Sequence, residues 1–189
     1  MLAAIEHEGP VIYLEHKLLS DYWLDAAGSG GRETVNFDVP LEGAHGLVPK
    51  VWKPVPLAQA IQRRDGEDLT IISVGVGVHR SLEAAQILEK DGFSVGVIDI
   101  RTVAPLDKKT LINAVSKTGH LVVVDEDYET FGLSGELAAI VLEAGIQVRY
   151  GRVCTRDTIP YSRELEDETL PNTQRIVNTA LKVMNQTGT

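Results

Sequence analysis

The sequence predicts an α/β fold in which a three-layer α/β/α domain is built around a mostly parallel sheet. Short apolar segments rich in β-branched residues recur between residues 69 and 154, and segments with helical spacing of apolar residues separate them. Glycines follow the helical segments where left-handed caps belong. Strands that are apolar throughout are buried on both faces, which is typical of a parallel sheet covered by helices on both sides.

The expected elements follow one another in strand–helix alternation. The expected strands are 69–74, 94–100, 120–125 and 147–154, and the expected helices are 81–91, 108–117, 134–144 and 172–185. Asp107 is the expected N-cap of the second helix, because a side-chain oxygen there can accept from a free backbone N–H. The stretch 155–171 is polar and interrupted by prolines, and within it Glu164–Glu168 with Pro171 is predicted to form an ordered surface loop that leads into the last helix.

The first 56 residues differ from the rest. Leu2 to His7 has the pattern of a helix end, and Pro10 to Glu15 that of a short buried strand. The stretch 20–56 is rich in glycine and proline and has no periodicity, which indicates a linker. We therefore expect 1–19 to be the tail of a truncated domain, 20–56 a linker, and 57–189 the α/β domain.

Composition limits the function. The net charge of −9 disfavours nucleic acid as a partner, since phosphate binding needs concentrated Lys and Arg. No run of roughly 18 apolar residues is present, so no membrane span is expected. The N-terminus resembles neither a secretory signal nor a transit peptide, and a single cysteine, Cys154, fits a reducing compartment. A cytoplasmic location is expected.

The turn after the first strand of the sheet resembles part of a dinucleotide-binding fingerprint. Gly75 and Gly77 fill two of the three glycine positions, and Asp99 follows at about the offset of a ribose-binding acid. Arg80 occupies the third position, where it would crowd helix–strand packing. The alternative is a plain turn, with Asp99 paired to Arg101 or capping the next element. His79 is expected at the end of this strand, as a structural or interface histidine.

Other candidate sites are weaker. The five histidines have no metal-ligand spacing, so no metal site is predicted. The acidic run 125–127 is expected to be a solvated loop or a contact surface, with a cation site as the sharper alternative. Cys154 has no neighbouring His or cationic cluster to lower its pKa, and we expect a buried strand cysteine. No Ser/His/Asp arrangement is specific enough to name.

Several strings resemble the C-terminal part of β subunits of thiamine-diphosphate-dependent 2-oxo acid dehydrogenases, the decarboxylating component. They lie in the expected order over nearly the whole chain: residues 10–19, 79–85, 97–107, 118–126, 135–139, 158–161 and 165–171. The resemblance implies a transketolase C-terminal-type domain, with the last strand of the preceding domain attached. The chain departs from the family in a longer linker around 21–53 and in Glu129–Gly132, where an Arg-Thr-Gly-Gly-type loop is common.

The resemblance implies assembly rather than catalysis by this chain. Thiamine diphosphate and magnesium belong to the parent enzyme and its α subunit, so no catalytic, cofactor-binding or metal residue carries over. The expected partners are the α subunit and the lipoyl acyltransferase core, with a homodimer formed by the 57–189 domain in isolation. Candidate subunit or interdomain contacts are Glu15, His16, Lys17, His79, Arg101, Glu126, Glu166 and Asp167.

The parent would oxidatively decarboxylate a 2-oxo acid, such as pyruvate or a branched-chain acid, and transfer the acyl group to lipoyl. Two alternatives remain open. One is a stand-alone module that binds a nucleotide or an acidic metabolite at Gly75–His79. The other is the corresponding domain of a transketolase-like enzyme.

Overall fold

A computed structural model describes residues 1–16, 50–51 and 53–185. A five-stranded sheet of order β1-β3-β2-β4-β5 forms the middle layer. Its strands are β1 (Ile61–Arg64), β2 (Leu69–Ser73), β3 (Val95–Asp99), β4 (His120–Tyr128) and β5 (Arg149–Thr155). β2 to β5 are parallel and β1 runs antiparallel to β3 at the edge, which confirms the mostly parallel α/β fold.

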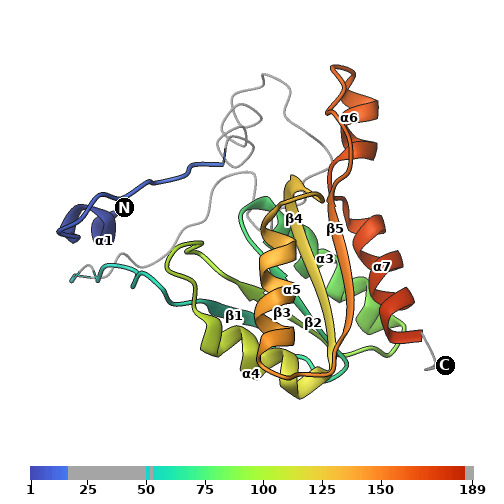
Figure 1. Ribbon diagram of the computed structural model, residues 1–189. Coiled ribbons are helices and arrows are strands. Elements are labelled where there is room, and N and C mark those ends of the chain that lie inside the picture. The colour runs from blue at the N-terminus through green and yellow to red at the C-terminus, as the bar shows by residue number, and fades with distance from the viewer. Residues whose placement is uncertain (17–49, 52, 186–189) are drawn as a thin grey trace.

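Helices cover both faces of the sheet (Figure 1). They are α3 (Val76–Lys90), α4 (Lys108–Thr118), α5 (Leu133–Glu143) and α7 (Thr173–Asn185), whereas α6 (Arg163–Thr169) projects beyond the ends of β4 and β5. α3 and α7 pack on one face and α4 and α5 on the other, so that each face has its own apolar core. α1 (Leu2–Glu6) buries no residue and lies apart from the sheet.

The burial of the central strands explains why their positions can be predicted from runs of apolar residues in the sequence. All five residues of β2 and all five of β3 are buried, and β4 is buried from Leu121 to Asp125. Adjacent residues of a strand point to opposite faces, so such a strand supplies both cores at once. Asp107 caps α4 as expected, with its side chain accepting from the N–H of Thr110 at 3.1 Å.

Four sequence expectations are wrong in detail. α3 begins at Val76 rather than at 81, so Gly77 and His79 are helical and Gly75 is the N-cap. β4 continues to Tyr128, and the acidic run 125–127 is strand rather than loop. Residues 163–169 form α6 instead of a loop, and 10–15 contain no strand and are exposed. β1, with its polar Gln-Arg-Arg sequence, is an additional edge strand.

The turn between β1 and β2 depends on a close backbone approach. A Cβ at Gly66 would overlap the backbone N of Gly96 in β3. Only glycine leaves room for β1 to fold back so tightly against β3.

Gly66→Ala is therefore expected to lower the free energy of unfolding by about 3 kcal/mol, because the backbone must move to admit the methyl group. Gly135→Ala is the matched control. Nothing lies within 4 Å of a Cβ at this position of α5, and we expect a gain of about 0.5–1 kcal/mol. Urea denaturation of both variants measures the two changes, and equal effects would contradict the close approach.

Candidate functional site

The strand order places a candidate site between β2 and β4. The chain passes from β2 to β3 on one side and then to β4 on the other side of β2. In open parallel sheets, ligands bind outside the carboxyl ends of the strands where the order reverses in this way. Here that position lies between the start of α3 and the end of β4, and we call it the switch crevice.

His16 from the N-terminal segment occupies the switch crevice. Its Nε2 contacts a carboxylate oxygen of Glu126 in β4. Its ring carbon Cδ2 lies 3.3 Å from where a Cβ on Gly75 would stand. Gly75 has a φ of +59°, so glycine suits both the left-handed backbone and the space that the imidazole takes.

Arg80 reaches the same carboxylate from inside α3. It is only 4% exposed, and its Nη1 lies 3.1 Å from Oε1 of Glu126. The same nitrogen donates to the carbonyl oxygen of Pro171, before α7. The expectation that Arg80 would crowd the packing of helix on strand is wrong. Arg80 instead joins α3, β4 and the connection between α6 and α7.

A second arginine holds the same connection. Nη1 of Arg175, in α7, donates to the carbonyls of Thr169 at 2.7 Å and Leu170 at 2.9 Å. Its Nη2 donates to the carbonyl of Cys154 in β5 at 2.8 Å. Three consecutive carbonyls, from the last residue of α6 to Pro171, are thus bound by two guanidinium groups, and we call this the arginine clamp. Sequence reasoning missed it because its acceptors are backbone carbonyls.

A second charged cluster surrounds Asp99 at the end of β3. Arg63 of β1 binds one of its oxygens through Nε and Nη2, at 3.1 and 2.8 Å. The backbone N–H of Arg101 donates to the other oxygen at 3.1 Å, while the Arg101 guanidinium binds the carbonyl of Gln59. The predicted side-chain pair of Asp99 with Arg101 is therefore replaced by a pair with Arg63.

His79 lies near this cluster, half-buried in the first turn of α3. Burial lowers the pKa of its imidazole, and the neighbouring Arg63 lowers it further, while Asp99 acts in the opposite direction. These causes favour the neutral ring.

The structure thus brings some predicted contact residues together and leaves others apart. His16 and Glu126 meet directly, whereas His79 and Arg101 border Asp99. Glu166 and Asp167 lie on α6, and Glu15 is exposed. Lys17 lies outside the described residues.

The acidic end of β4 is buried only at its first residue. Asp125 is buried, and burial raises the pKa of its carboxyl group. Among the described residues, no group of three or more His, Cys, Asp or Glu could hold a metal ion. Cys154 is buried in β5, as expected, and burial raises the pKa of its thiol.

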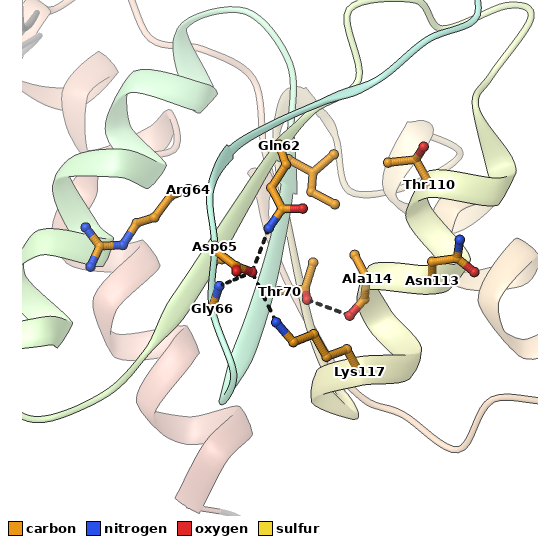
Figure 2. Close-up of a pocket in the computed structure, with 11 residues that line it drawn as sticks. Gln62, Arg64, Asp65, Gly66, Thr70, Thr110, Asn113, Ala114 and Lys117 are labelled. Atoms are coloured by element: carbon orange, nitrogen blue, oxygen red, sulfur yellow. Dashed lines mark hydrogen bonds and ion pairs between the residues drawn. The ribbon is translucent and has the colours of Figure 1, made fainter.

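A hollow of about 430 Å³ lies beside β1 and α4, away from the switch crevice (Figure 2). Figure 2 shows its carboxylate, Asp65, facing the ends of Gln62 and Lys117. Oδ1 of Asp65 accepts from both side chains, at 2.8 and 3.2 Å, and from the N–H of Gly66 at 3.0 Å. Because the charged groups of its wall bind one another, the hollow offers no aimed reactive group.

Within the described part of the chain, the contacts of Arg80 and Arg175 hold α3, β4, β5 and the connection between α6 and α7 together. Glu126 is engaged by a guanidinium and an imidazole, and Cys154 is kept as a thiol. Fold and site therefore define an α/β domain whose ligand crevice is filled by its own side chains.

The comparison with protein families agrees with this description. The family model described as "Transketolase, C-terminal domain" matches residues 58–176. The chain belongs to this family, which confirms the resemblance seen in the sequence.

Named relatives are β subunits. The chain is 32% identical to the mitochondrial pyruvate dehydrogenase E1 component subunit beta of Dictyostelium discoideum, over 96% of this chain and 47% of the relative. It is 34% identical to the acetoin:2,6-dichlorophenolindophenol oxidoreductase subunit beta of Cupriavidus necator, over 97% of this chain and 49% of the relative. The chain spans about half the length of the curated relatives it matches.

A solved structure supports the fold. The split-gene transketolase described as an inactive beta4 tetramer has a TM-score of 0.64 and 25% identity, over 72% of this chain and 46% of that chain. In the described part of the chain, no helix combines the length and apolar character needed to cross a membrane.

Arg80→Met tests how much the contacts of Arg80 with Glu126 and with the carbonyl of Pro171 contribute to stability. The substitution leaves Glu126 without its guanidinium partner and should cost about 3 kcal/mol of unfolding free energy. Arg156→Met removes an arginine that also pairs with a glutamate, Glu129, but is 72% exposed. This control should cost less than about 1 kcal/mol. Chemical denaturation compares the two, and a similar small loss for both would contradict the structural role of Arg80.

His79→Gln tests the burial of the imidazole. Because the pKa of His79 is lowered in the folded state, the unfolded chain binds the proton more readily. Stability is therefore fully present above the ordinary pKa of 6.5 and is lost as the pH falls through the lowered value. The variant should lose less stability than the parent between pH 7.5 and pH 5, as thermal unfolding at each pH would measure. An unchanged slope would show that His79 is not a source of acid sensitivity.

Proposed function

We propose that this chain is the C-terminal assembly domain of a 2-oxo acid dehydrogenase β subunit. The observation that carries the proposal is the extent of the similarity. The match to β subunits covers 95–97% of the chain and so includes the segment before residue 58, where the family model begins. In the structure that segment supplies His16, which is fastened to Glu126 of the domain.

The proposed parent oxidatively decarboxylates a 2-oxo acid, such as pyruvate or a branched-chain acid, and passes the acyl group to a lipoyl carrier. Its proposed partners are an α subunit and a lipoyl acyltransferase core, and the proposed location is the cytoplasm. A second copy of this chain is the proposed partner in isolation, through the 57–189 domain.

Thiamine diphosphate with magnesium would serve the parent enzyme, but the described residues of this chain do not fit it. In the switch crevice the ring of His16 lies against Glu126, and this carboxylate is also paired with Arg80, so these described side chains engage one another rather than stand ready to hold a diphosphate or a metal ion. No group of metal-binding side chains was found in the described segments. The proposal therefore assigns this domain positioning and assembly, and no chemical step.

A transketolase-like parent is the second candidate, favoured by the structural match to a transketolase at a TM-score of 0.64. That match covers 72% of the chain, less than the β-subunit relatives cover. The third candidate, a nucleotide- or metabolite-binding module at Gly75–His79, has less support because His16 packs against Gly75.

The test pairs the full-length protein with the α subunit of the same organism. Together they should decarboxylate 2-oxo acids when thiamine diphosphate and magnesium are added, measured by reduction of an artificial electron acceptor. Neither protein should do so alone. Ketol transfer between sugar phosphates, without 2-oxo acid oxidation, would favour the transketolase candidate. In titration calorimetry, the 189-residue chain should give no saturable heat with thiamine diphosphate and magnesium, and saturation at micromolar cofactor would contradict the assignment.

A further inference from the structure

A line of polar contacts runs from the N-terminal segment to the connection between α6 and α7. Nε2 of His16 contacts one oxygen of the Glu126 carboxylate, and Nη1 of Arg80 lies 3.1 Å from the other oxygen. The same Nη1 donates to the carbonyl oxygen of Pro171. We call these four residues the polar relay, because each contacts the next across three separate segments of the fold.

The backbone around the middle of the polar relay is fixed. The carbonyl of Glu126 accepts from Oγ1 of Thr155 at 2.7 Å, which ties the end of β4 to β5. The first turn of α3 packs tightly on the strands, since a Cβ at Gly77 would overlap the hydroxyl oxygen of Ser73. That hydroxyl donates to the carbonyl of Val124 at 2.8 Å. A change within the polar relay is therefore a change in side-chain contacts and not a shift of α3 or β4.

The two ends of the polar relay lie on less embedded segments. Residues 10–15 are all exposed, whereas the side chain of His16, which follows them, is 25% exposed. At the other end Pro171 is buried, but α6 before it projects beyond the ends of β4 and β5 (Figure 1). Segments with little buried surface open more easily than core strands do. Movement is therefore expected at the ends of the polar relay rather than at its centre.

Different burial makes the two contacts of Glu126 depend on each other. The side chain of Arg80 is 5% exposed, so its charge relies on the carboxylate, whereas the Glu126 side chain is 23% exposed and accessible to water. Contact with His16 restricts the orientation of this carboxylate. Without that contact, water competes for the oxygen and the side chain gains rotamers that turn its other oxygen away from Arg80.

We propose that the polar relay couples the N-terminal segment to α6, so that a displacement of this segment loosens the connection between α6 and α7. Release of His16 lets the Glu126 carboxylate turn. The Arg80 guanidinium follows it, because a buried cation keeps its counter-charge, and the carbonyl of Pro171 then loses its donor. The proposal goes beyond the proposed function and is independent of the reaction of the parent enzyme.

The other half of the arginine clamp keeps the loosened connection attached. Arg175 binds the carbonyls of Thr169 and Leu170, and it is held in turn by the carbonyl of Cys154 in β5. The expected response is therefore local opening of α6 rather than unfolding of the domain. Because coupling between two sites is reciprocal, a contact made at α6 must also change the attachment of the N-terminal segment.

Hydrogen–deuterium exchange of the full chain, labelled from milliseconds to minutes, tests this coupling. The amide of Leu170 donates to the carbonyl of Glu166 at 2.9 Å, so its exchange rate reports the opening of α6. His16→Ala should make this amide exchange about 5-fold faster, a typical size for coupling between two sites. His7→Ala is the matched control, because His7 is an exposed histidine of the same segment that binds the N–H of Gly9. The control should change the rate by less than about twofold.

Glu126→Gln supplies the second half of the test. Glutamine keeps the size of the side chain but removes its charge, so the amide of Leu170 should again exchange faster. Adding His16→Ala to this variant should change the rate little further, because both substitutions act through the same side chain.

Four results would overturn the coupling. They are an unchanged rate at Leu170 in His16→Ala, an equal effect of His7→Ala, and additive effects of His16→Ala and Glu126→Gln. The fourth is exchange that becomes equally faster in the fully buried strand β2, since this would show a loss of global stability instead.

Discussion

The buried guanidinium of Arg80 is the interaction on which the carboxyl edge of the sheet depends. A charge at 4% exposure must be neutralised by neighbouring groups, since burial without a partner is costly. Glu126 supplies the opposite charge, and the carbonyl of Pro171 accepts from the same nitrogen. Satisfying one cation therefore fixes the positions of α3, β4 and the connection before α7. His16 is attached to the same carboxylate, so the N-terminal segment depends on Arg80 indirectly.

This arrangement places the chain's own side chains at the usual ligand position of a doubly wound sheet. The usual ligand position of such a fold lies at the switch crevice. In this chain an imidazole lies against Gly75, and the nearby carboxylate of Glu126 is paired with the guanidinium of Arg80. Large side chains that follow β4 and β5 are exposed to solvent instead.

The sequence predicted the parts whose cause is local. β2 and β3 were readable because every residue is buried, and the Asp107 cap because its acceptor lies three residues from its donor. β1 was missed because an exposed edge strand tolerates polar residues, and α6 because 163–169 has few apolar residues. The pair of His16 with Glu126 joins residues 110 positions apart, and the partners of Arg175 are carbonyls. Neither the His16–Glu126 pair nor the contacts of Arg175 can be predicted from residue spacing or residue type.

The shifted pKa values support the same interpretation of the interior. Burial is the largest cause of the raised pKa of Asp125, Tyr150 and Cys154 and of the lowered pKa of His79. In each case the shift favours the neutral form. A catalytic cysteine needs the opposite, a lowered pKa that yields the thiolate. The buried cation of the same interior is paired instead, since Glu126 and the carbonyl of Pro171 engage Arg80, and these contacts hold α3, β4 and the connection before α7 in place.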